Sequence, residues 1–157
     1  MAAPTGPSAR TDAGARLAGS MLADDASFLL ARATAIALAD ANRTLAVHGL
    51  KVRSYAVLAL VAGELRPSQR EVADILRLDP SQVVPLVDDL ERSGLVERLP
   101  DPRDRRANLV VATPRGREVA QAARESLREV DGRLYGGLGA EEREQLSSLL
   151  NRIAFGD

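Results

Sequence analysis

The sequence predicts a mainly α-helical protein with one small β-hairpin, and three observations lead to this fold class. Apolar residues recur at helical spacing over most of the 157 residues. Two short runs, 95–99 and 108–112, are rich in apolar or β-branched residues, as strands are. Residues that cap helices, and glycines that end them, separate these segments.

The stretch from Asp79 to Gly94 carries the clearest helix signal. Asp79 suits the N-cap and Pro80 the first helical position, where a missing N–H does little harm. Gly94 is expected to end the helix, because glycine adopts a left-handed backbone at low cost. The apolar side chains of this helix form one stripe, made of Val83, Leu86, Val87 and Leu90.

An arginine-rich loop joins the two predicted strands, and helices lie on both sides of this hairpin. The run S-Q-R-E at 68–71 is a capping box, and it begins a helix that ends shortly before Asp79. Because the next helix starts at once, a tight turn joins the two helices. The loop 100–107 holds two prolines, two aspartates and three arginines, and we expect it to project into solvent. Thr113 and Pro114 begin the next helix. This order is that of a winged helix-turn-helix with a two- or three-stranded wing.

Composition argues against several classes of function. The chain has no cysteine and one histidine, so disulfides, thiolate chemistry and an imidazole metal site are not expected. It contains neither a nucleophile-elbow motif nor a phosphate-binding glycine loop, and we expect neither an enzyme nor a bound cofactor. No apolar run approaches the roughly 20 residues that span a bilayer. The N-terminus lacks the pattern of a signal peptide, so we expect a cytoplasmic protein.

The residues around the hairpin resemble the MarR family of bacterial transcriptional regulators. The similarity rests on the run S-Q-V-V-x-L-V-D-x-L-E-x-x-G-L-V-E-R, on D-P-R-D-R-R and on T-P-x-G. The resemblance implies a homodimer whose first and last helices form the interface. It also implies a repressor that releases DNA when a small aromatic or anionic effector binds. Because the chain has no cysteine, we do not expect the thiol-oxidation switch of some relatives.

We expect three parts in the chain. Residues 1–22 form a flexible N-terminal tail, since they are rich in small residues and proline. Residues 23–50 and 113–157 form a helical dimerisation region, and residues 51–112 form the winged helix-turn-helix lobe. The predicted first helix, 24–47, has an apolar face too wide for this chain alone to cover, which indicates a dimer partner.

The helix after Asp79 is the expected recognition helix for double-stranded DNA. In a homodimer, two such helices enter successive major grooves about 34 Å apart, which implies a pseudo-palindromic operator. Gln82 can pair with adenine through two hydrogen bonds, and Ser81 can reach a base or a phosphate. Val83 or Val84 is expected to touch a thymine methyl group. Phosphate anchors are expected at the start of the preceding helix, from Ser68 and Gln69.

The loop between the strands is the expected minor-groove contact. Arg106 is the preferred residue for insertion into a narrow groove, with Arg103 and Arg105 binding phosphates or sharing that role. Asp104 is expected to orient an arginine through a carboxylate pair, because phosphate would repel it from DNA. A solvated turn of mixed charge is the alternative, which the neighbouring recognition helix disfavours.

Pro85 departs from the family pattern, since many relatives carry a polar or basic residue there. Proline lacks an N–H and crowds the carbonyl of Ser81, at a cost of about 3 kcal/mol in a helix interior and less near the first turn. We expect a tightened or kinked first turn, in which Ser81 and Gln82 carry more of the sequence readout.

Four residues near the cleft that the resemblance implies, between the dimerisation and DNA-binding regions, are candidates for the effector site. His48 suits a cap at a helix C-terminus, and Tyr55 suits the core, but each also suits a ligand cavity. The four candidates are Arg43, His48, Arg53 and Tyr55. The alternative to a DNA-binding regulator is a winged-helix module that binds another protein through the same surface.

Overall fold

The computed structural model describes residues 14–102, 104 and 107–156. Its contacts divide the chain into two compact units, one ending at Ala39 and the other beginning at Asp40. The boundary falls inside helix α2, Ala26–Leu45. Each unit is described by itself below.

In the first unit, residues 14–18 are helical and most of α2 follows after a turn. The N–H of Phe28 donates to Oδ1 of Asp25 at 2.7 Å, which caps the start of α2. This helix agrees with the predicted span to within two residues. Its large apolar side chains are 42–46% exposed, namely Leu29, Leu30, Ile36 and Leu38.

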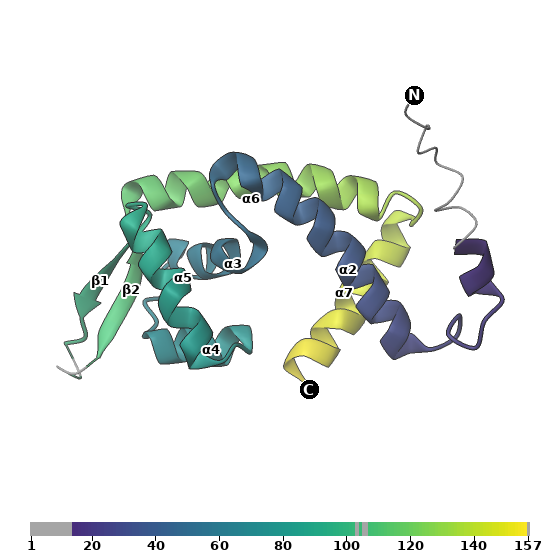
Figure 1. Cartoon of the computed structure of the whole chain (residues 1–157), viewed down its shortest axis with the longest axis horizontal. Helices are drawn as coiled ribbons and strands as arrows, with labels where there is room; N and C mark the ends of the chain where they lie inside the picture. Colours follow the sequence, from purple (N-terminus) through teal and green to yellow (C-terminus); the bar gives the residue numbers. More distant parts are fainter. Residues whose placement is uncertain (1–13, 103, 105–106, 157) are drawn as a thin grey trace, which may run out of the picture. The chain divides into compact units, whose positions relative to one another are not determined.

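The second unit begins with the end of α2 and the short 3-10 helix η1, Ala46–His48. Gly49 ends it with a φ of 71°, as expected of a glycine after a helix. The helices α3, Val52–Ala62, α4, Gln69–Leu76, and α5, Pro80–Arg92, follow. Figure 1 shows these helices beside the hairpin.

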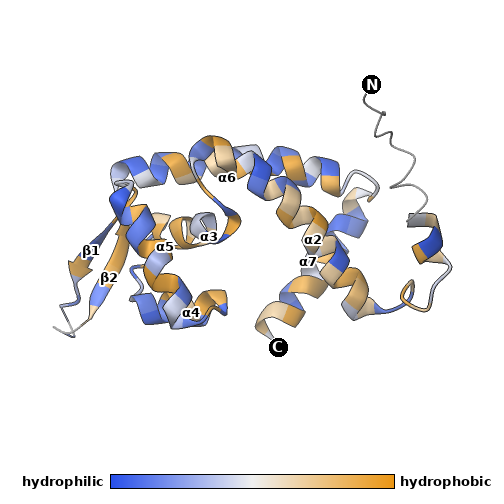
Figure 2. Cartoon of the chain, in the orientation of Figure 1, coloured by the Kyte–Doolittle hydropathy of each residue, from blue (hydrophilic) through white to orange (hydrophobic). Residues whose placement is uncertain are grey.

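One apolar core holds this second unit together. Its buried members come from α2, α3, α4, α5, both strands of the hairpin and the helix that follows it, so each element contributes its apolar face. In Figure 2, apolar (orange) and polar (blue) residues both occur along α5. The largest fully buried side chains are Leu45, Val57, Leu58, Val61, Val72, Val83, Val87, Val96 and Val110.

The wing is a two-stranded antiparallel sheet of β1, Val96–Pro100, and β2, Asn108–Ala112. Val96 lies opposite Ala112, and Pro100 opposite Asn108. A third strand is reduced to one isolated bridge between Ser68 and Leu109. The mainly α fold with a small wing is thus confirmed.

Helix α6, Pro114–Leu134, starts directly against the hairpin. The side chain of Thr113 accepts from the N–H of Gly116 at 3.0 Å and donates to the carbonyl of Gly94 at 2.8 Å. A Cβ on Gly116 would lie 1.9 Å from the carbonyl oxygen of Leu95. Glycine is therefore required for this close approach, which explains the last letter of the T-P-x-G run.

Helix α7, Ala140–Phe155, follows a break that begins at Tyr135, the C-cap of α6. The N–H of Gly139 donates to Oε2 of Glu142 at 2.7 Å, which holds the start of α7. Several apolar side chains of α7 are exposed in the single chain: Leu149 at 53%, Ile153 at 73% and Phe155 at 80%.

Among the described residues, no single helix has both the length and the apolar character to cross a membrane. One bent pair of segments, Ala26–His48 with Val52–Ala62, meets the length and composition test jointly.

Candidate nucleic-acid interface

Helix α5 has one buried face and one exposed polar face. Val83, Val87 and Leu90 are buried, at the spacing that the apolar stripe predicts. Ser81 and Gln82 are exposed at the start of the helix. The helix therefore presents its polar N-terminal turn to a partner while its apolar stripe fixes it to the core.

The expected contact between Val83 and a thymine methyl group is wrong. Val83 is fully buried, because it shares the core-facing side of α5 with Val87 one turn later. Its neighbour Val84 lies about 100° further round the helix and is 45% exposed. Of the two valines considered, only Val84 is accessible to a base.

The cap of α5 occupies the hydroxyl of Ser81. Oδ1 of Asp79 accepts from the backbone N–H of Ser81 at 2.8 Å and also from its hydroxyl. These two hydrogen bonds lower the pKa of Asp79, the hydroxyl bond having the larger effect. With its proton directed at Asp79, the Ser81 oxygen offers only lone pairs to DNA. It suits a base amino group better than a phosphate.

Pro85 lies inside α5, and the helix continues through it from Pro80 to Arg92. Because proline has no N–H, it leaves the carbonyl of Ser81 without its usual helical donor. The larger share of readout by Ser81 and Gln82 stays a prediction.

The predicted capping box at the start of α4 is present. Oε2 of Glu71 accepts from both the N–H and the hydroxyl of Ser68, at 2.7 and 2.8 Å. The hydroxyl oxygen of Ser68 accepts from the N–H of Glu71 at 3.3 Å. Both donors of Ser68 are therefore engaged within the chain, and Gln69 is the better placed of the two expected phosphate anchors.

Arg98 joins three elements of the lobe. It lies on β1, and its guanidinium donates to Asp88 and Glu91 of α5 and to Oε1 of Gln69 of α4, the last at 3.1 Å. Its side chain is only 20% exposed. Burial alone lowers the pKa of Arg98, but the hydrogen bonds and charges of Asp88 and Glu91 raise it overall.

The role of Arg98 was missed in the sequence, where this residue was given no function. The alternation of inward-facing and outward-facing residues along a strand could have predicted this role. Arg98 lies two residues after the buried Val96 and so on the same inward face of β1. An arginine on an inward face needs carboxylate partners, and α5 supplies two.

The base of the wing loop is closed by backbone hydrogen bonds. The N–H of Asp101 donates to the carbonyl of Ala107, and the N–H of Ala107 donates to that of Asp104, both at 3.0 Å. Asp101 itself is buried, with 8% exposure. The expected DNA contacts Arg103, Arg105 and Arg106 lie outside the described residues, and the orienting role of Asp104 stays a prediction with them.

A cavity of about 520 Å³ lies between α3 and α6. Its lining combines small apolar residues with Tyr55 and two cations, Arg117 and Arg124, which are seven residues apart on α6 and hence on one face. The full lining is Tyr55, Ala59, Ala62, Gly63, Arg117, Ala120, Gln121 and Arg124.

Of the four effector candidates from the sequence, Tyr55 is the one among the lining residues of this cavity. Arg43 forms an exposed ion pair with Asp40. The ring Nε2 of His48 lies 3.0 Å from the hydroxyl of Ser126, so His48 links η1 to α6. The arginines of α6 were not anticipated, because their proximity to α3 depends on packing between distant segments.

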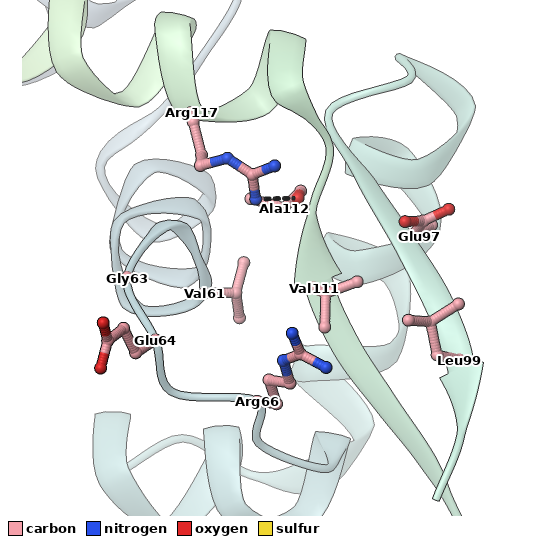
Figure 3. A pocket seen from close by; sticks show the side chains of 9 residues that line it. All are labelled: Val61, Gly63, Glu64, Arg66, Glu97, Leu99, Val111, Ala112 and Arg117. Atoms are coloured by element: carbon pink, nitrogen blue, oxygen red, sulfur yellow. Dashed lines mark hydrogen bonds between the residues drawn. The ribbon is translucent and has the colours of Figure 1, made fainter.

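A second cavity of about 490 Å³ lies between the end of α3 and the wing. It shares Gly63 and Arg117 with the first cavity. Figure 3 shows the guanidiniums of Arg66 and Arg117 turned into it, and Arg117 donates to the carbonyl of Ala112 at 2.7 Å. The described residues contain no cluster of His, Cys, Asp or Glu able to hold a metal ion.

A helix-turn-helix with an exposed polar recognition helix and an adjoining hairpin defines the class: a winged helix-turn-helix regulator. Comparison with known proteins agrees. A model of the MarR family matches residues 48–107. A MarR-family transcriptional regulator from Rhodococcus sp. RHA1 is 40% identical, with a TM-score of 0.83 over 88% of this chain and 99% of that one.

Two solved structures of proteins called CouR are also similar. One, from Rhodococcus jostii RHA1 and bound to p-coumaroyl-CoA, is 41% identical with a TM-score of 0.79, over 88% of this chain and 98% of that one. The other, a transcriptional repressor bound to a 23-mer DNA duplex, is 29% identical with a TM-score of 0.80, over 87% and 96%. The chain belongs to the MarR family of transcriptional regulators.

Proposed function

We propose that the protein is a homodimeric repressor that binds a pseudo-palindromic operator in double-stranded DNA and releases it when a small effector binds. The observation that carries this is the exposed polar start of α5 beside the β1–β2 wing. A relative bound to a DNA duplex supports it. We assign no enzymatic reaction to the chain. We expect it to act in the cytoplasm, where bacterial operators lie.

The parts of the chain divide the work. Residues 51–112 bind DNA, residues 23–50 and 113–157 form the dimer, and residues 1–22 are a tail. The exposed apolar side chains on α7 support the dimer, because burying them against a second copy would remove apolar surface from water. DNA contacts come from Gln69, Ser81, Gln82 and Val84, and from the wing residues Arg103, Arg105 and Arg106.

Fluorescence anisotropy with the protein's own upstream DNA tests this function. We expect binding that weakens steeply with salt, because phosphate contacts release counterions. Arg106→Ala should weaken it further, whereas Arg128→Ala on α6, which removes the same charge, should not. Absence of binding at low salt by a folded protein, together with capture of a protein partner, would favour the protein-binding alternative.

The effector is an anionic aromatic compound, and we assign it to the cavity between α3 and α6. Tyr55 and the alanines can pack against an aromatic ring, while Arg117 and Arg124 can pair with an anionic group. The relative bound to p-coumaroyl-CoA supports an aromatic acyl thioester as the first compound to try.

Titrating p-coumaroyl-CoA into the protein–DNA complex tests the effector, with p-coumarate and free coenzyme A as controls. Release of DNA should require a higher concentration in Arg124→Gln than in wild type, because one cation of the cavity is lost. Equal sensitivity of Arg124→Gln and wild type would contradict the assigned cavity without affecting DNA binding.

A further inference from the structure

Arg98 forms a closed hydrogen-bond network with α4 and α5, and it is not among the expected DNA contacts. Its Nε–H donates to Oε1 of Gln69, while its two terminal nitrogens donate to Asp88 and Glu91. The backbone N–H of Arg98 also donates to Oε1 of Glu91, at 3.2 Å. The guanidinium thus uses all three of its nitrogens within the protein, and it is poorly placed to bind a phosphate itself.

The network fixes the orientation of the Gln69 amide. Arg98 offers only donors, so the amide must turn its oxygen toward Arg98 and its NH₂ group to the other edge. Within the described part of the chain, this NH₂ group has no hydrogen-bond partner. Gln69 is the first residue of α4, where side chains of helix-turn-helix proteins reach phosphates.

The network also compensates two negative charges on the recognition helix. Asp88 and Glu91 lie on α5, and their carboxylates are 46% and 41% exposed. Unpaired carboxylates on this helix would repel the phosphates of DNA. Arg98 pairs with both at once, so one residue removes much of this repulsion.

We propose that Arg98 is a positioning residue for DNA binding, which aims the NH₂ group of Gln69 at a backbone phosphate and compensates Asp88 and Glu91 on α5. The inference rests on the proposed function, since it requires DNA on this surface. Strand β1 then has a second role besides forming the wing, because its residue Arg98 orients the Gln69 amide at the start of α4.

A double-mutant cycle on the full-length protein tests the link between Arg98 and Gln69. Gln69→Ala alone should weaken DNA binding about tenfold, the size of one hydrogen bond to a charged group. Arg98→Met should weaken it more, because the carboxylates then lack their partner. In the Arg98→Met background, Gln69→Ala should change affinity less than twofold, because the amide is no longer held.

A matched cycle provides the control. Arg66 is exposed and makes no hydrogen bond with Gln69, so Arg66→Met and Gln69→Ala should be additive. Comparing two DNA sequences tests whether Gln69 contacts a phosphate. Phosphate contacts carry no sequence information, so Gln69→Ala should weaken operator and scrambled DNA by the same factor. If Arg98→Met unfolds, the cycle is run with Arg98→Lys, which keeps the charge but cannot hold three partners in one plane.

Two results would overturn the inference. One is a loss on Gln69→Ala that is equal in the wild-type and Arg98-substituted backgrounds. The other is unchanged affinity in Gln69→Ala alone. In either case the proposed function still stands if the wild-type protein binds its operator. If the wild-type protein binds no DNA, both the inference about Arg98 and the proposed function are wrong.

Discussion

At the scale of single residues, charge at the start of α5 connects stability to pH. The pKa of Asp79 is lowered by the two hydrogen bonds from Ser81, which favour the ionised form. A lowered folded-state pKa stabilises the fold above the ordinary aspartate value of about 3.9. That contribution is lost as the pH falls through the lower, folded-state pKa.

The substitution Asp79→Ala should therefore lower the melting temperature at neutral pH, and its difference from wild type should shrink below about pH 4. Asp79→Asn is the control, because asparagine also caps helices but has no charge to lose. Thermal unfolding of the three proteins between pH 3 and pH 7 measures this. A difference between wild type and Asp79→Ala that is constant over this range would show that the carboxylate charge is irrelevant.

At the scale of elements, the junction of β1 and α6 depends on a residue without a side chain. The start of α6 lies directly on the carbonyl of Leu95, and the N–H of Thr113 donates to the same oxygen at 3.0 Å. Any Cβ at position 116 must displace either the helix or the strand.

Gly116→Ala should destabilise the protein by about 3 kcal/mol or more, because overpacking against backbone cannot be relieved by a rotamer change. Gly132→Ala in the same helix meets nothing within 4 Å, and it should stabilise the protein by up to about 1 kcal/mol through helix propensity alone. Chemical denaturation of both variants compares them. Equal effects of the two substitutions would disprove the close approach.

The elements that could be predicted from sequence are those set by local chemistry. The caps at Ser68, Asp79 and Thr113 lie where they were expected, because each depends on residues within three positions of itself. Arg98 could not be assigned in this way, since its partners come from α4 and α5, up to 29 residues away. A DNA contact was expected for Val83 although this residue belongs to the apolar stripe of α5. The stripe faces the core, and Val83 is therefore buried.

At the scale of the whole molecule, two copies of the recognition helix are needed to read two half-sites. Exposed apolar side chains on α7 supply surface for association, and Ile153 is among the most exposed of them. We expect Ile153→Glu to shift the protein toward monomer, because a buried carboxylate without a partner is costly.

Sedimentation velocity measures this shift, and operator affinity should fall in parallel because each monomer offers one helix. Asn151→Glu is the control, since two residues along a helix lie on nearly opposite faces. Should Ile153→Glu remain a dimer with full affinity, the interface must lie elsewhere.

In the proposed complex, α5 and the wing of two copies bind successive grooves of one duplex. Hydroxyl-radical footprinting on the protein's own upstream DNA tests it most directly. We expect two protected segments about one helical turn, or 34 Å, apart, with flanking minor-groove protection that Arg106→Ala removes. A single protected segment, or flanking protection unchanged in Arg106→Ala, would contradict it.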